Sequence, residues 1–127
     1  MRTSEATSCA VVVIAAGLSA TTLAEAADTF RKLSDSEIRS KISGMEIVDV
    51  EDHWAEQYKR DGSLKVFAMS KATTGKWRVR NGELCIEDAA PDSGCGEVWI
   101  SGNKIEFRGE GPRLGLQGIL QKQQPRK

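Results

Sequence analysis

Two hairpin signals and two cysteines lie within the stretch from Gly75 to Phe107. Asn81-Gly82 separates two segments of alternating apolar and polar residues, and Asn-Gly is the strongest short hairpin signal because both turn residues need a positive φ. The cross-strand pairs that a two-residue turn predicts are Arg80 with Glu83, Val79 with Leu84, Arg78 with Cys85, Trp77 with Ile86, and Lys76 with Glu87. This single register puts apolar residues on one face and charged residues on the other.

A second hairpin is predicted at Gly102-Asn103, because a pair with glycine first suits a type II′ or type I′ turn. The predicted pairs are Ser101 with Lys104, Ile100 with Ile105, Trp99 with Glu106, Val98 with Phe107, and Glu97 with Arg108. The apolar members share one face, and Cys95 and Trp99 fall on the other.

Cys85 and Cys95 therefore lie on the face opposite the core, in consecutive strands joined by the loop Asp88–Gly94. We expect a disulfide between them. The alternatives are two free thiols or a pair of metal ligands. A metal is disfavoured because the sequence has neither a CxxC motif nor a histidine near the cysteines. In the chain-entropy view, a bridge that closes a loop of about ten residues contributes roughly 2–3 kcal/mol.

Residues 1–26 have the layout of a secretory signal peptide. A short segment with Arg2 precedes the apolar run Cys9–Leu18, and Ala24-Glu25-Ala26 matches an A-x-A cleavage site. We expect cleavage after Ala26, with Ala27 as the second choice. The apolar run is too short to span a membrane, so the sequence predicts a periplasmic or secreted protein without a transmembrane segment.

The charge balance argues against nucleic acid as a partner. The chain has 18 basic and 18 acidic residues. Removal of residues 1–26 takes one base, Arg2, and two acids, Glu5 and Glu25, so the mature net charge is about +1. Phosphate binding needs clustered Lys and Arg. We expect a small molecule or an envelope protein as the partner, with no oligomeric state indicated.

Residues 27–122 are expected to form one domain. Residues 27–32 read as a loose segment, Ser34 and Glu37 form a capping box that begins a short helix, and Gly44 ends it. Strands are expected at 45–50, 54–68 and 114–120 besides those named above. In the hairpin 54–68, a three-residue loop ending at Gly62 puts Tyr58 opposite Leu64. Residues 123–127 are expected to be a disordered tail.

The pattern amounts to one short N-terminal helix followed by about eight antiparallel strands with short connections. We expect a mainly β fold, either an antiparallel up-and-down barrel or a strongly curved sheet. Closure into a barrel would leave no unpaired strand edge. The helix must rest on the sheet or close one end of the barrel, because it is too short to stand alone.

The sequence contains no nucleophile motif, Walker loop, HExxH or G-x-G-x-x-G. His53 is the only histidine, and its neighbour Asp52 would point to the opposite face of a strand. Glu56 shares the predicted inner face with Trp54 and Tyr58, as in an enclosed site for a polar ligand. The alternative is a solvated carboxylate at the barrel mouth. We predict no catalytic residue, no metal and no cofactor, and therefore no enzyme.

Trp54, Glu56, Tyr58 and Trp77 are the candidate ligand-binding residues. A barrel of about eight strands admits side chains or at most one small ligand, so these aromatics either surround a ligand or fill the interior. Trp99, on the outer face, either packs on the disulfide and the helix or belongs to a partner-binding surface.

Four segments carry a family resemblance, namely Leu33–Gly44, the stretch from Trp54 through Tyr58 to Asp61-Gly62, the run Gly75–Val79 with Leu84-Cys85, and Cys95 with Gly102-Asn103. They resemble small exported bacterial proteins of the lipocalin-like β-barrel type, which implies a barrel fold and export. A weaker resemblance is to bacterial metalloprotease inhibitors built on a small barrel, which share a G-x-W strand and one disulfide. In those inhibitors the mature N-terminus enters the protease cleft, whereas here a predicted helix follows the N-terminus closely.

Export, the barrel pattern and the aromatic inner face together favour a non-enzymatic periplasmic barrel that binds a small ligand or an envelope component. The alternative function is an inhibitor or protein-binding module that acts on a periplasmic or secreted enzyme.

Overall fold

The structure, a computed structural model of the 127-residue chain, describes residues 10–17, 29–89, 93–109 and 115–126. The elements in chain order are β1 (Arg31–Lys32), α1 (Asp35–Ile42), β2 (Met45–Val48), β3 (Trp54–Tyr58), β4 (Ser63–Ala68), β5 (Lys71–Arg80), β6 (Glu83–Glu87), β7 (Gly94–Ser101), β8 (Lys104–Arg108) and β9 (Gln117–Lys122). The expected signal cleavage site and Leu114 lie outside the described residues. No described helix has the length and apolar character needed to cross a bilayer.

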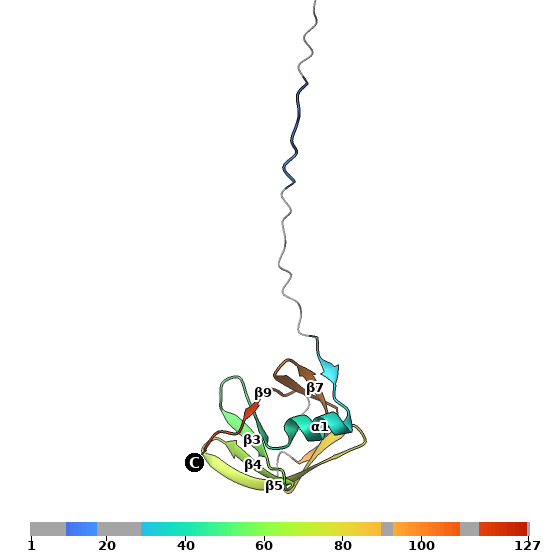
Figure 1. The fold of residues 1–127 in the computed structure, drawn as a ribbon. Coiled ribbons are helices and arrows are strands. Elements are labelled where there is room, and N and C mark those ends of the chain that lie inside the picture. Colours follow the sequence, from blue (N-terminus) through green and yellow to red (C-terminus); the bar gives the residue numbers. More distant parts are fainter. Residues whose placement is uncertain (1–9, 18–28, 90–92, 110–114, 127) are drawn as a thin grey trace, which may run out of the picture.

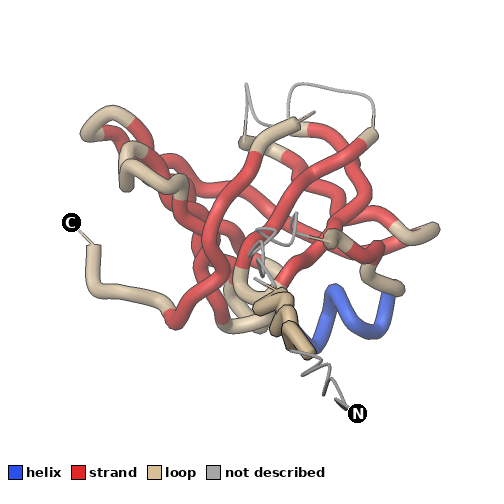
Figure 2. Tube along the Cα trace, turned by 90° about the horizontal axis from the view of Figure 1, so that it is seen from above, coloured by secondary structure: helices blue, strands red, loops and turns tan. Residues whose placement is uncertain are grey.

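The strands β2 to β9 form a closed antiparallel barrel (Figures 1 and 2). Each of β2 to β8 pairs with the next strand along the chain, and β9 pairs with β2 to close the ring. Every barrel strand therefore pairs with two neighbours over at least part of its length, so none of them is an edge strand. Of the two expected architectures, the barrel is the correct one.

The hairpin registers predicted from the sequence are confirmed. Arg80 pairs with Glu83 across the Asn81-Gly82 turn, and Ser101 pairs with Lys104 across Gly102-Asn103. Tyr58 pairs with Leu64, which fits the three-residue loop with Gly62 at a φ of +90°. The period-two alternation fixes these registers because a slip by one residue would turn every apolar side chain outward.

β1 is a strand that the sequence did not predict, since residues 27–32 read as a loose segment. Arg31 and Lys32 pair with Ile100 and Trp99 of β7. The free edge exists because β6 pairs only with the first half of β7, as far as Glu97. β1 satisfies the backbone of the second half, and Leu33 donates its amide to Val98 O at 2.8 Å.

α1 packs against one end of the barrel, between β7 and β5 in Figure 1. The predicted capping box is present, because Glu37 N donates to Ser34 Oγ and Ser34 N donates to Glu37 Oε1. Asp35 accepts the amide of Gly82 at 2.6 Å, and Arg39 donates to Val79 O at 3.1 Å. The helix is thus tied to the β5–β6 turn and closes this end, which we call the helix end.

The core is one cluster that fills the barrel and continues under α1. Ile38 and Ile42 of the helix are fully buried and belong to it. The largest fully buried apolar side chains are Tyr58, Phe107, Leu33, Ile38, Ile42, Ile47, Leu64, Ile86 and Ile105. Burial of each large side chain contributes about 1.5–3 kcal/mol relative to exposure.

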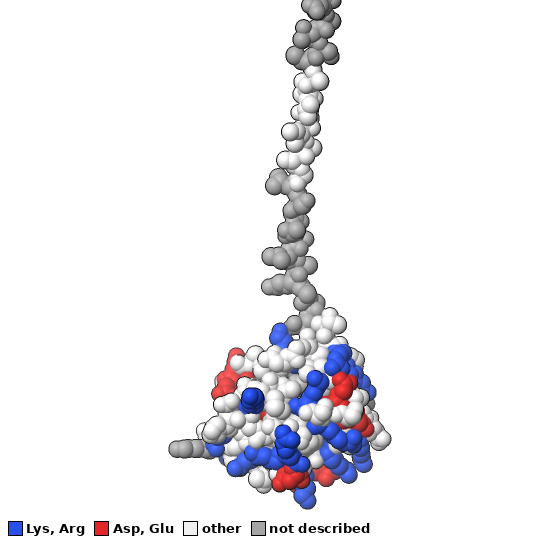
Figure 3. All heavy atoms as spheres, viewed as in Figure 1, with Lys and Arg blue, Asp and Glu red and all other residues white. Residues whose placement is uncertain are grey.

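The outer face carries the charged residues. The side chains of Lys76, Arg78 and Arg80 alternate along β5, and Arg78 Nη2 lies 2.7 Å from Glu87 Oε1 of β6. Figure 3 shows Lys and Arg gathered over the part of the surface where β5 lies in Figure 1. This distribution is the one that the predicted alternation requires.

The disulfide between Cys85 and Cys95 is confirmed. The two cysteines are direct cross-strand partners of β6 and β7, with their Cα atoms 4.0 Å apart. The bridge closes the loop between these two strands. A disulfide is typical of proteins outside the reducing cytosol.

Removal of the bridge by Cys85→Ala with Cys95→Ala should lower the free energy of unfolding by about 2–3 kcal/mol, because the unfolded chain regains the entropy of the open loop. Urea unfolding of the oxidised protein and of the double variant measures the difference. Thiol labelling of both cysteines in the unfolded but unreduced mature protein would contradict the bridge.

Gly118 of β9 lies where no side chain fits. A β-carbon there would stand 2.7 Å from Ile47 Cγ2, 2.7 Å from Val48 O and 3.3 Å from Trp54 Cη2. Gly118→Ala should therefore destabilise the barrel by about 1–3 kcal/mol through overpacking. Gly96→Ala is the matched control, because its nearest neighbour would be Arg108 O at 3.4 Å. Thermal unfolding of both variants measures the difference. Equal losses of stability in the two variants would contradict the close approach of Ile47 and Val48 to Gly118.

Candidate functional site

The end of the barrel opposite α1, which we call the mouth, contains an open pocket. The turns β2–β3 and β4–β5 lie at this end and supply its lining. The mouth pocket has a volume of ≈ 870 Å³, and its lining residues are Asp49, His53, Trp54, Ala68, Met69 and Ser70. This size falls within the range of small-molecule sites, about 300–1,000 Å³.

Trp54 connects the pocket to the barrel interior. It begins β3, pairs with Ala68 of β4, and its ring reaches toward Gly118 of β9. Of the four residues that the sequence nominates for ligand binding, Trp54 is the one that lines the mouth pocket.

The β4–β5 turn forms an apolar rim that the sequence did not reveal. Met69 and Ser70 both have positive φ, +49° and +65°, and the Met69 side chain is 90% exposed. A two-residue turn of this kind favours Asn and Gly, so a Met-Ser turn carries no recognisable signal. Strained backbone at the edge of a pocket is a common mark of a functional site.

The β2–β3 turn forms the opposite rim. Asp49 Oδ1 accepts hydrogen bonds from the amides of His53 and Trp54, the latter at 3.2 Å. The His53 ring is 71% exposed, with Nδ1 3.3 Å from Glu51 Oε2 and 3.6 Å from Asp49 Oδ2. His53 is thus a rim residue, held among carboxylates rather than beside Asp52 as a pair.

Glu56, Tyr58 and Trp77 lie deeper than the mouth pocket and fill the barrel. Glu56 is 3% exposed and accepts a hydrogen bond from the hydroxyl of the fully buried Tyr58. The Tyr58 and Trp77 rings meet edge to face with centroids 5.7 Å apart, and Trp77 Nε1 donates to Lys59 O at 2.8 Å. Glu56 therefore does not belong to a solvated mouth, and it does not share a cleft with His53.

Trp99 lies on the outer face, as expected, but it is covered. The Arg108 guanidinium stacks over the Trp99 ring, 4.0 Å from its centroid, and also donates to Glu106 at 2.9 Å and 3.2 Å. Trp99 is half-buried under this arginine, which limits the surface it offers to a partner.

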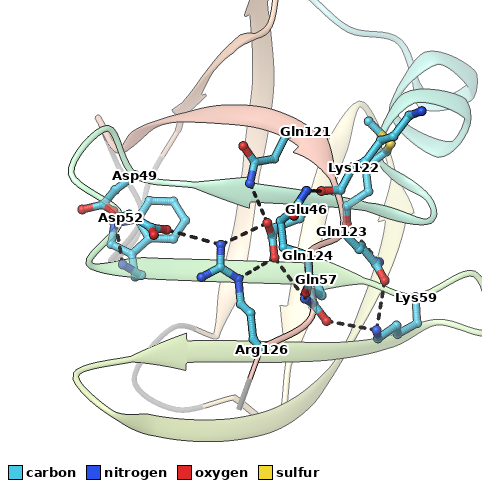
Figure 4. A network of polar contacts seen from close by, with 12 residues as sticks. Glu46, Asp49, Asp52, Gln57, Lys59, Gln121, Lys122, Gln123, Gln124 and Arg126 are labelled. Carbon is cyan, nitrogen blue, oxygen red and sulfur yellow. Dashed lines mark hydrogen bonds and ion pairs between the residues drawn. The ribbon is translucent and has the colours of Figure 1, made fainter.

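A polar network lies on the outer face of β2, β3 and β9 and extends from the helix end toward the mouth (Figure 4). Its centre is Glu46 of β2, a fully buried carboxylate. The hydrogen bonds that Glu46 accepts come from Arg126 at 2.7 Å and 3.1 Å, from Gln57 at 3.0 Å and from Gln121 at 2.7 Å. Burial by itself would raise the pKa of Glu46, but these hydrogen bonds and the guanidinium charge of Arg126 outweigh burial and hold the pKa at about 2.

The residues that bury Glu46 belong to the expected disordered tail. Residues 123–126 lie against the outer face: Gln123 donates to Met45 O and Tyr58 O at 3.2 Å and 3.3 Å, and Gln124 O accepts from Gln57 at 2.8 Å. This differs from the expectation because a polar composition says nothing about a buried partner for Arg126. Lys127 lies outside the described residues.

Within the described ranges, no group of three or more His, Cys, Asp or Glu side chains is placed to hold a metal ion. The chemistry that the mouth presents is an indole, an exposed thioether and rim carboxylates, which suits non-covalent binding.

The ionisation of Glu46 should make the free energy of unfolding depend on pH in the acid range. Its pKa is about 2 in the folded chain against an ordinary value of 4.5, so its contribution is fully present above pH ~4.5 and is lost as the pH falls toward 2. The loss amounts to about 3 kcal/mol. Urea unfolding between pH 5 and pH 2 should show a shallower decline for Glu46→Gln than for the wild type, whereas the exposed Glu51→Gln should keep the wild-type slope. Identical slopes for all three would contradict this assignment.

Comparison with protein-family models, with curated proteins and with solved structures finds no match for this chain. The resemblances to lipocalin-like barrels and to metalloprotease inhibitors therefore stay predictions from the sequence. The fold shows a small β-barrel, and any function has to be argued from the residues of the site.

Proposed function

We propose that this chain is an exported, non-enzymatic barrel that binds a small, mainly apolar ligand or the apolar part of an envelope component at its mouth. The observation that carries the proposal is the mouth pocket of ≈ 870 Å³ between Trp54, Ala68 and Met69. An aromatic floor with a flexible thioether at the rim suits apolar ligands of varied shape.

The filled interior supports this location over a deep one. Tyr58 is fully buried and packs edge-on against Trp77, so a ligand has room above Trp54 and not among the aromatics below it. The signal-peptide pattern and the disulfide fit a protein that meets its ligand outside the cytosol.

The polar groups of the rim would set ligand orientation. Asp49 and His53 stand on one side of the pocket and Ser70 on the other, so a polar end of the ligand can face solvent beside them. A few polar groups around an apolar pocket give specificity.

Binding of the neutral fluorescent probe N-phenyl-1-naphthylamine tests the proposal. We expect fluorescence enhancement with the wild type and a loss of affinity of about tenfold for Ala68→Leu, because three added carbons occupy the pocket. Val50→Ser is the matched control: Val50 is 80% exposed on the same β2–β3 turn but does not line the mouth pocket. No probe binding by the wild type, or equal affinity in Ala68→Leu, would contradict the proposal. Native mass spectrometry of protein purified from its own periplasm identifies a natural ligand.

A further inference from the structure

We propose that residues 123–126, which we call the clasp, hold the β2–β3 turn in the position where it forms a wall of the mouth pocket, and that release of the clasp lowers ligand affinity. This inference rests on the proposed function, because it assigns the regulation of the same pocket. The positioning residue is Arg126.

The clasp is attached along its length to the outer face of β2 and β3. Gln123 reaches the backbone of Met45 and Tyr58 near the helix end, where Lys59 Nζ also lies 3.0 Å from Gln123 Oε1. From there the segment runs over Gln57, which donates to Gln124 O, toward Arg126 near the mouth (Figure 4).

Arg126 joins a buried carboxylate to the β2–β3 turn at the rim. Its guanidinium makes a bidentate contact with Glu46, which is fully buried, while its own side chain is 20% exposed. The same guanidinium lies 3.3 Å from Asp52 Oδ1 in the β2–β3 turn. A buried carboxylate holds its cation firmly because separation would leave an uncompensated charge, so Asp52 is tied to a fixed point.

The tied turn includes pocket residues. Asp52 N donates to Asp49 O at 3.1 Å and Asp49 N donates to Trp54 O at 3.2 Å, so Asp52, Asp49 and Trp54 belong to one hydrogen-bonded unit. Asp49, His53 and Trp54 line the mouth pocket. A change in the clasp therefore reaches the pocket through the turn.

The clasp is held by polar contacts and has hollows on both sides. One hollow of ≈ 280 Å³ lies between Arg126 and the β4–β5 turn, and another of ≈ 500 Å³ lies between Arg126 and Ile119 of β9. Residues 124 and 125 are exposed, so the polar contacts of Gln123 and Arg126 hold the clasp, and loss of those contacts opens it. Ligand and clasp are then coupled, because a ligand that binds the clasped state better also stabilises the clasp.

Hydrogen exchange of the β2–β3 turn, measured by mass spectrometry together with probe affinity, tests the proposal in the full chain. For Arg126→Gln we expect exchange at the His53 and Trp54 amides to rise about tenfold and probe affinity to fall about fivefold. Arg78→Gln is the matched control, because it breaks an arginine–glutamate pair on β5 that touches neither the turn nor the pocket. We expect no change there in exchange at the turn or in affinity.

Arg126→Gln also leaves the buried Glu46 without its cation and lowers overall stability, so a second variant separates the two effects. Asp52→Asn keeps the pair of Arg126 with Glu46, and asparagine accepts the φ of +58° found at Asp52. Exchange at the turn should rise about threefold with overall stability unchanged.

Unchanged exchange in both variants would overturn the clasp, and so would a rise in probe affinity, which would mean that the segment blocks the pocket instead of shaping it. Faster exchange at the turn in a protein that binds no probe would support the clasp as a positioning element and reject the proposed function. The hydrogen-exchange measurement therefore tests the clasp, and probe binding by the wild type tests the proposed function, so one can fail without the other.

Discussion

The closed barrel of eight strands limits everything else in this protein, because its interior is only about as wide as the side chains that fill it. Tyr58, Phe107 and Ile105 occupy that interior, and α1 closes one end with Ile38 and Ile42. Among the residues that the structure describes, no helix lies at the mouth. Within the barrel interior, room for a ligand is therefore left at the mouth, where Trp54 is only partly buried.

The parts of the fold that the sequence predicted are those in which local and non-local preferences agree. In the Asn81-Gly82 hairpin, turn chemistry, alternation and charge pairing require the same register, and the structure has it. The disulfide follows from that register, since it makes Cys85 and Cys95 direct neighbours. Such segments can be predicted from the sequence because turn chemistry, side-chain alternation and charge pairing all specify the same structure.

The parts that were missed depend on partners distant in sequence. β1 exists because β7 is longer than β6 and leaves an edge at Trp99 and Ile100. Residues 123–126 are ordered because Arg126 finds Glu46, 80 positions away. The candidate site was predicted in part for the same reason: Trp54 was found by alternation, whereas Met69 and Ser70 form a turn whose residues give no turn signal.

Backbone strain is concentrated at the mouth. Among the described residues, the non-glycine residues with positive φ are Asp52, Met69, Ser70, Asn81 and Asp88. Asn81 is the only one of them at the helix end, in a turn that asparagine favours. The other four stand at the mouth, where Met69 and Ser70 have no conformational preference for such a φ. Positions that violate a local rule persist when the surrounding structure compensates for them or when function requires them.

At the β2–β3 turn of the mouth, polar contacts compensate for the backbone strain more than packing does. Asp52 contacts Arg126, Asp49 accepts the amides of the β2–β3 turn, and Glu46 holds Arg126 in place. An apolar residue at position 46 would remove the cost of burying a charge, but it would also leave Arg126 and the turn without a fixed point. The buried ion pair on the outside of the barrel, where most side chains face water, therefore has two roles: it stabilises the folded chain at neutral pH, and in the clasp proposal it also positions the mouth.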